Sequence, residues 1–258
     1  LTDMKRRRAL LLPKKKPGAA PRNTSPLWGE DRRGGLFYLL AKQDEGSFVR
    51  ERRFALVQWW TMRYLIGVDE AGRAPLAGPV SVGAVIVPEG FDVQRAFPGV
   101  KDSKLLTPRK REEIYGEAAA RSRAGELRFC VRFSEHAYID DYGITRAVRR
   151  AVQRCVSALA PSPEGVRVYL DGLLYAPSKY EQETVVHGDA LVPLISLASV
   201  VAKVRRDRLM AKFAARFPNY GFEVHKGYPT KFHREAIRRY GLCEIHRVTY
   251  SRKFASAR

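Results

Sequence analysis

Four acidic residues follow short apolar segments of this 258-residue chain: Asp69, Glu70, Asp171 and Asp189. Hard divalent cations such as Mg²⁺ prefer several carboxylate oxygens as ligands, so acids gathered at strand ends can form a metal site. Without a cation, four crowded carboxylates would repel one another and raise each other's pKa. The alternative is a set of separate, solvated acids at turns, since carboxylates are common on protein surfaces. The repetition of the pattern favours the metal site.

Three short apolar segments that precede these acids have the length and composition of buried strands: 64–68, 166–170 and 184–186. Gly72 and Pro75 interrupt the strand pattern after the first segment. If the three strands belong to one parallel or mixed sheet, the acids lie along one edge, where the sites of open α/β sheets form. Successive side chains on a strand point to opposite faces, so Asp69 and Glu70 are expected to converge only if the backbone turns between them.

The remaining sequence predicts an α/β domain. Two more segments have a strand-like apolar pattern: 80–87 and 127–133. Helices are expected at four places: 108–120, 144–159, 194–217 and 230–240. Thr107 and Pro108 supply an N-cap and a first-turn proline for the first helix, and Gly241 ends the last. In 144–159 apolar residues recur at spacings of three and four while arginines face elsewhere, which is typical of a helix packed on a core.

Six segments of the chain resemble ribonuclease HII and occur in the same order: 69–80 (DEAGRAPLAGPV), 102–104 (DSK), 171–172 (DG), 188–189 (GD), 198–207 (ASVVAKVRRD) and 225–228 (HKGY). Any one of these motifs alone would be weak, whereas several in order are specific. The resemblance covers about residues 63–254. It implies a ribonuclease H-like fold, in which helices flank a mixed sheet.

The resemblance also implies an activity. Such an enzyme hydrolyses the RNA strand of RNA/DNA hybrids and nicks duplex DNA on the 5′ side of single embedded ribonucleotides. The implied products are a 3′-hydroxyl and a 5′-phosphate, formed with Mg²⁺ or Mn²⁺. The metal-binding and catalytic residues would be the four acids: Asp69, Glu70, Asp171 and Asp189. In the two-metal scheme one ion activates the attacking water and the other stabilises the leaving 3′ oxygen.

Nucleic-acid contacts are implied for nine residues: Gly72, Arg73, Ala74, Ser103, Lys104, Ser199, Lys203, Lys226 and Tyr228. Tyr228 would pack on the sugar at the junction and help to read the 2′-hydroxyl, whereas the alternative is a half-buried tyrosine after a glycine turn. Lys104 and Lys203 would contact phosphates, although lysines usually cover a solvated surface. Ser103 and Ser199 could equally cap a helix or pack among small residues.

Ala74 departs from the family pattern, which usually has Gly-Arg-Gly after Asp-Glu-Ala. The family's backbone at this place contacts the ribose 2′-hydroxyl, and alanine retains the backbone N–H and carbonyl. Recognition is expected to survive if Ala74 has a negative φ angle. If φ must be positive, alanine costs about 1 kcal/mol and shifts the loop. The hypothesis is therefore retained activity with an altered preference for isolated ribonucleotides.

The chain carries 47 Lys and Arg residues against 27 Asp and Glu, a formal net charge of +20. This excess favours phosphate backbones and predicts salt-sensitive binding. No apolar run approaches the length of a membrane span, so a soluble protein is expected. A cytoplasmic location and a monomer are also expected. The three cysteines are too few and too scattered for a disulfide framework or a metal motif.

Residues 1–62 differ from the expected catalytic domain, 63–258. They contain basic runs and no sustained periodicity. One interpretation is a disordered nucleic-acid-binding arm. A second, which is favoured, is a non-native extension upstream of a natural start at Met62. A third is a cleavable presequence, but the acids within this stretch argue against it.

Two other functions stay open beside the one implied. A ribonuclease HIII-type nuclease would have a distinct, folded N-terminal substrate-binding domain, for which residues 1–62 look too short and irregular. An inactive nucleic-acid-binding protein of the same fold is the second possibility. The presence of all four acids argues against it.

Overall fold

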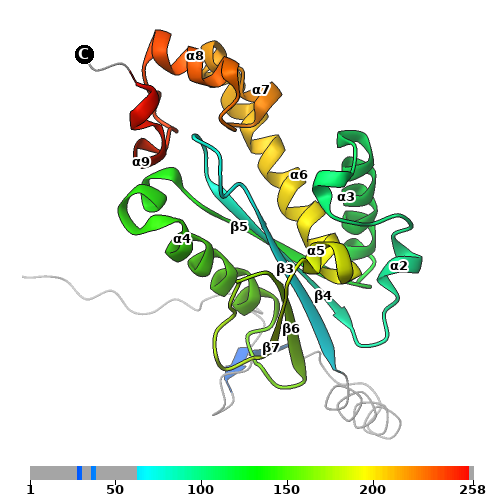
Figure 1. Cartoon of the computed structure of the whole chain (residues 1–258). Helices are drawn as coiled ribbons and strands as arrows, with labels where there is room; N and C mark the ends of the chain where they lie inside the picture. Colours follow the sequence, from blue (N-terminus) through cyan, green and yellow to red (C-terminus); the bar gives the residue numbers. More distant parts are fainter. Residues whose placement is uncertain (1–27, 31–35, 39–62, 256–258) are drawn as a thin grey trace, which may run out of the picture. The chain divides into compact units, whose positions relative to one another are not determined.

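The computed structural model describes residues 28–30, 36–38 and 63–255 (Figure 1). Within the first 62 residues, β1 (Trp28–Glu30) and β2 (Leu36–Tyr38) form a two-stranded antiparallel sheet. The interpretations of 1–62 as an arm, a non-native extension or a presequence otherwise fall outside the described residues.

A five-stranded mixed sheet forms the centre of the larger unit. Its strands are β3 (Tyr64–Ala71), β4 (Val80–Pro88), β5 (Arg128–Ser134), β6 (Val166–Asp171) and β7 (Glu181–Val185). They are ordered β5-β4-β3-β6-β7. β4 is antiparallel to β3 and β5, whereas β6 is parallel to β3 and β7. The predicted α/β fold with a mixed sheet is confirmed.

Helices and 3₁₀ turns connect and cover these strands. They are α2 (Val93–Ala96), η1 (Ser103–Leu105), α3 (Pro108–Arg123), α4 (His136–Leu159), α5 (Gly188–Leu191), α6 (Pro193–Arg216), η2 (Pro218–Tyr220), α7 (Phe222–His225), α8 (Lys231–Tyr240), α9 (Val248–Ser251) and η3 (Arg252–Phe254). The predicted cap of α3 is present, because Lys110 N donates to Thr107 Oγ1 at 3.2 Å. α4 starts before the predicted helix, and Gly143, with φ +80°, breaks it just before Ile144. In the described part of the chain no helix is long and apolar enough to cross a membrane.

The two long helices cover opposite faces of the sheet (Figure 1). β4 is buried along nearly its whole length, as expected for a strand covered on both sides. Val82 and Ala84 pack in the cluster with α4, and Val85 packs in the cluster with α6. A Cβ on Gly83 would lie 2.5 Å from the Ala198 carbonyl oxygen, so glycine permits the close approach of α6.

A third apolar cluster lies at the C-terminal end of α6, near α7, α8 and α9 (Figure 1). Leu76 and Ala77 enter this cluster from the segment between β3 and β4. Ala77 also forms an isolated antiparallel bridge with His246. We call residues 72–79 the junction loop. Its packing links the first strand of the sheet to the C-terminal helices.

Candidate metal centre and nucleic-acid interface

Three of the four predicted acids converge where the central parallel pairing ends. β3 and β6 are paired up to Val68 and Leu170, and Asp69 and Asp171 are the next residues along each strand. Side-chain oxygens of Asp69, Glu70 and Asp171 all lie within 4.8 Å of one another. We call these three residues the acid cluster. Its all-oxygen donor set suits a hard cation such as Mg²⁺ or Mn²⁺.

The route by which these carboxylates converge differs from the prediction. β3 continues to Ala71, with Asp69 opposite Gly83 and Glu70 opposite Val82 on β4. The expected departure from the strand between the two acids is therefore wrong. The carboxylates converge at the point where the pairing of β3 with β6 ends, at Val68 and Leu170.

Asp189 lies beside the acid cluster rather than inside it. The sequence places it after a strand, but β7 ends at Val185 and Asp189 belongs to the short helix α5. Its backbone N–H donates to Asp171 Oδ1 at 3.3 Å, which fixes the two acids next to each other. Its Oδ2 atom lies 3.2 Å from Lys104 Nζ.

Lys104 is the cation nearest to this fourth acid. Its ammonium group also lies 3.6 Å from Asp102 Oδ1. Partial burial lowers the pKa of Lys104, but the hydrogen bond to Asp189 and the charges of Asp102 and Asp69 together raise it above its usual value. Lys104 therefore carries a stable positive charge at the margin of the acids.

Burial makes the charged state of the acid cluster unfavourable. Loss of hydration raises the pKa of Asp69 well above its usual value, and the charge of Glu70 raises it further. Burial also raises the pKa of Glu70, although Arg73 opposes this effect. The pKa of Asp171 is raised by burial and by the charge of Asp189. A divalent cation would offset this repulsion, so the electrostatics fit a metal site.

Ser103 and Ser199 lie next to the acid cluster, and Ser199 contacts Asp69. Both serines are buried, and their Oγ atoms are hydrogen-bonded to each other at 2.9 Å. A hydrogen bond between Ser199 and Asp69 lowers the pKa of that acid, against the effect of burial. Contacts of these two serines with nucleic acid stay a prediction.

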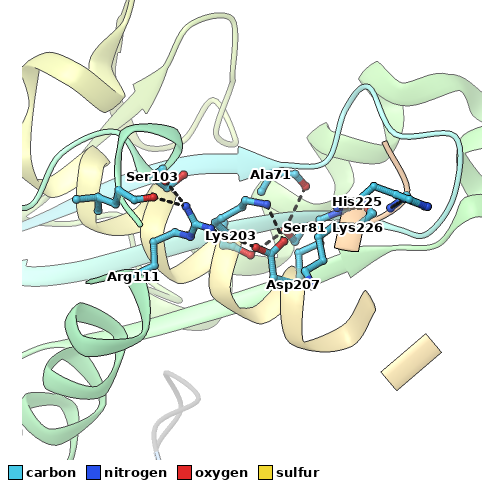
Figure 2. Close-up of polar contacts among 12 residues, drawn as sticks. Ala71, Ser81, Ser103, Arg111, Lys203, Asp207, His225 and Lys226 are labelled. Carbon is cyan, nitrogen blue, oxygen red and sulfur yellow. Dashed lines mark hydrogen bonds and ion pairs between the residues drawn. The ribbon is translucent and has the colours of Figure 1, made fainter. Parts of the chain in front are cut away.

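Lys203 and Tyr228 line a groove of about 560 Å³ between α3, α6 and α7. Figure 2 shows Lys203 pointing to Asp207 one turn along α6, and the Nζ–Oδ1 distance is 2.7 Å. Lys203 Nζ lies 5.8 Å from the centre of the Tyr228 ring. Burial lowers the pKa of Lys203. Arg111 closes one side of this groove, where its Nη1 atom donates to the carbonyl oxygen of Ser103 at 2.8 Å.

The other predicted contacts lie on two loops. Gly72 is buried, whereas Arg73 and Ala74 are exposed. Arg73 Nη1 lies 3.1 Å from Glu70 Oε1, so this arginine reaches the acid cluster. Lys226 adopts a left-handed conformation with φ +52° and lines the groove beside Tyr228.

The backbone at Ala74 resolves the two alternatives for this position. Among the described residues, the non-glycine residues with positive φ are His187 and Lys226. Ala74 therefore lies outside the left-handed region, and its exposed side chain meets no conformational penalty. The strain that would have altered the preference for isolated ribonucleotides is absent.

Two buried arginines are not among the predicted site residues. Arg206 and Arg247 are both 0% exposed and bind backbone carbonyl groups of the junction loop. Arg206 belongs to the 198–207 motif, which was the available signal for it. Nothing in the local sequence distinguishes Arg247 from a surface arginine.

Comparisons with known proteins agree with this geometry. A family model described as "Ribonuclease HII" matches residues 66–253. The ribonuclease HII of Coxiella burnetii is 42% identical over 186 residues, which cover 72% of this chain and 87% of the relative. The ribonuclease HII of Leuconostoc mesenteroides is 38% identical over 246 residues, which cover 89% of this chain and 93% of the relative. The crystal structure of ribonuclease H2 from Pyrococcus horikoshii OT3 superposes with a TM-score of 0.61 and 26% identity, covering 74% of this chain and 96% of that one.

Proposed function

The chain belongs to the ribonuclease HII family and is a nuclease, and we propose that it nicks duplex DNA on the 5′ side of single embedded ribonucleotides. It also hydrolyses the RNA strand of RNA/DNA hybrids, leaving 3′-hydroxyl and 5′-phosphate ends. The observation that carries this proposal is the convergence of Asp69, Glu70 and Asp171, with Asp189 hydrogen-bonded to Asp171.

The four acids would hold Mg²⁺ or Mn²⁺ in a two-metal arrangement. When bound, divalent ions supply a reactive water and stabilise negative charge on the leaving 3′ oxygen. The protein's contribution is to keep Asp69, Glu70 and Asp171 close together in spite of their repulsion. The buried serines and the antiparallel pairing with β4 fix the cluster, so it is formed before the substrate arrives.

The basic side chains would position the substrate's backbone. Lys104 lies beside Asp189, and Lys203 and Lys226 line the groove between α3, α6 and α7. Phosphate contacts of this kind orient a duplex without reading its sequence. Arg73 and Ala74 are exposed on the junction loop next to Glu70, where a ribose at the scissile position would lie. Tyr228 would pack on that sugar from the groove side.

Two alternatives stand less well with these observations. A ribonuclease HIII-type enzyme shares the carboxylate centre, but the family model that matches this chain is that of ribonuclease HII. An inactive nucleic-acid-binding protein would have no need to keep three carboxylates close together, one of them buried, at raised pKa.

A cleavage assay with the full chain tests the proposal. The substrates are a labelled DNA duplex with one ribonucleotide, a full RNA/DNA hybrid and an all-DNA duplex, each with Mg²⁺ or Mn²⁺. A nick 5′ of the ribonucleotide that disappears in Asp69→Asn is the expected result. Cleavage of the hybrid alone would reject junction recognition. Binding without cleavage of any substrate would favour the inactive alternative.

A further inference from the structure

Two buried arginines hold the junction loop by its backbone carbonyl groups, in addition to the hydrogen bonds that Leu76 N and Gly78 N donate to Gly227 O and Ile245 O. Arg247 donates from all three guanidinium nitrogens: to Gly72 O at 2.6 Å, to Arg73 O at 2.7 Å and to Gly78 O at 3.0 Å. The backbone N–H of Arg247 donates to Leu76 O at 2.7 Å. One residue from the C-terminal region thus fixes both ends and the middle of the loop.

Arg206 holds the same loop from α6. Its Nε and Nη2 atoms donate to Pro79 O at 2.9 Å and to Ala77 O at 3.2 Å. Its Nη1 atom donates to Lys226 O at 3.0 Å. Arg206 therefore connects the junction loop to the loop that carries Lys226 and Tyr228.

The loops are shaped to admit these guanidinium groups. A Cβ on Gly72, where φ is +96°, would lie 2.1 Å from Arg206 Nε. A Cβ on Gly227, where φ is +86°, would lie 2.5 Å from Ala77 O. Lys226 takes a left-handed conformation that a lysine rarely adopts, and its carbonyl oxygen is the one bound by Arg206. Glycines and a left-handed lysine therefore occur where the junction loop contacts the loop that carries Tyr228.

Neither arginine is explained by charge pairing. Both are 0% exposed, and among the described residues neither forms an ion pair with a carboxylate. Burial lowers the pKa of Arg247 to about 10, and the charge of Arg206 lowers it further. A fold that needed only packing here would be served by apolar side chains, which avoid the cost of burying a charge. An apolar residue cannot replace the planar guanidinium group, whose N–H groups donate to several carbonyl oxygens at once.

We propose that Arg247 and Arg206 are positioning residues that hold the junction loop and the Tyr228 loop in one fixed geometry, and so set discrimination for an isolated ribonucleotide. Neither guanidinium touches the substrate. The inference rests on the proposed function, because it assigns the reading of the 2′-hydroxyl to these two loops. The RNA strand of a full hybrid presents a 2′-hydroxyl at every position, so a displaced loop can still meet one. A duplex with a single ribonucleotide presents only one 2′-hydroxyl, so cleavage of this duplex should fall more.

The decisive variants are Arg247→Lys and Arg206→Lys, which keep the charge but lose the fork of hydrogen bonds. We expect kcat on the single-ribonucleotide duplex to fall about tenfold or more, since small displacements of positioning groups have effects of this size. KM should change little, and kcat on the full hybrid should fall less. The ratio of the two kcat values is the readout.

Ile237→Ala is the matched control for loss of stability. Ile237 is fully buried in the same apolar cluster as Leu76 and Ala77 but donates no hydrogen bond to the loop. It should lower the unfolding temperature without changing the kcat ratio. If the lysine variants lose stability as Ile237→Ala does and keep the wild-type ratio, the arginines are structural only and the inference is wrong.

Two further measurements extend the test, and the first does not require the lysine variants to fold. Ser251→Ala removes one neutral donor, whose Oγ lies 3.1 Å from Leu76 O, and should shift the ratio in the same direction by a smaller amount. Amide hydrogen exchange of peptide 72–79 in the free protein should be faster in Arg247→Lys than in Ile237→Ala. Equal exchange would overturn the inference. If the wild type fails to nick at a ribonucleotide, the proposed function fails, while the exchange measurement still reports on the loop.

Discussion

The acid cluster and the two buried arginines each place like charges close together in one domain, and the two regions satisfy those charges in different ways. Every guanidinium nitrogen of Arg206 and Arg247 donates to a backbone carbonyl oxygen. The carboxylates of Asp69 and Asp171 accept few hydrogen bonds and, among the described residues, form no ion pair.

The two buried arginines therefore have a structural role, whereas the acid cluster has the properties of a binding site. The arginines' donors are used within the protein, so they fix the loops without needing a ligand. The acids retain a raised pKa in spite of the partners that the chain supplies, so a cation from outside the chain can offset their remaining repulsion. Substitutions in the two regions should therefore have different effects. Neutralising an acid should abolish cleavage while relieving the repulsion between carboxylates. Replacing an arginine should loosen the junction loop.

The largest expected effect is the loss of cleavage in Asp69→Asn. Changes in the outer shell of metal sites cost about 10–100-fold, so loss of a direct ligand should reduce kcat by more than about 100-fold. Duplex binding should persist, because the lysines proposed to contact phosphates, Lys104, Lys203 and Lys226, are unchanged. Cleavage kinetics and gel-shift titration measure the two properties. Unchanged cleavage would mean that the acid cluster is not the catalytic centre.

Gly72→Ala tests the arginine region through stability. At this position φ is +96° and a Cβ meets the Arg206 side chain, so strain and overpacking should together cost roughly 2 kcal/mol or more. Gly90→Ala is the matched control, because its φ of +89° is similar and a Cβ there meets nothing within 4 Å. It should cost only about 1 kcal/mol. Urea denaturation compares the two, and equal losses would contradict a tightly filled site around Arg206.

Lys104→Ala tests whether the cation beside Asp189 also meets the substrate. Loss of one phosphate contact should reduce the slope of log K against log salt by about 0.9. Lys101→Ala, an exposed lysine on the same segment, should leave the slope nearer the wild-type value. Binding titrations at several salt concentrations measure both slopes. An unchanged slope in Lys104→Ala would confine this lysine to pairing with the acids.

The pH dependence of stability gives a smaller effect with a definite sign. Folding raises the pKa of Asp69, Glu70 and Asp171, so the folded metal-free protein binds more protons than the unfolded chain. The stabilisation from this protonation is complete below about pH 4, the usual carboxyl range, and is lost as pH rises through the raised values. The unfolding free energy of Asp69→Asn relative to wild type should therefore increase with pH, and millimolar Mg²⁺ should stabilise only the wild type.

Ala74→Gly should have the smallest effect. Ala74 is exposed and has no positive φ, so glycine relieves no strain and adds only backbone freedom. The ratio of single-ribonucleotide to hybrid cleavage should change by less than about twofold, in keeping with an energy difference of a few tenths of a kcal/mol. A large change would show that the loop needs the freedom of glycine during binding.

Strands and helices were predictable where periodicity and local signals agreed. The apolar segments 64–68, 80–87 and 166–170 became β3, β4 and β6, and Thr107 with Pro108 marked the start of α3. Errors arose where pairing decided the outcome. β3 extends through Asp69 and Glu70 because β4 supplies hydrogen-bond partners to that side, and Asp189 is helical although the local pattern resembled a strand end.

The sequence by itself identified four candidate metal-binding acids, the apolar segments that precede them and the resemblance to a family, because residue types and local spacing encode these properties. Tertiary structure alone decided which acids converge, that Ser103 and Ser199 are buried, and that Arg206 and Arg247 bind the junction loop. Burial and long-range hydrogen bonds depend on partners distant in the chain, as with Arg247 and Gly72. No local pattern reports them.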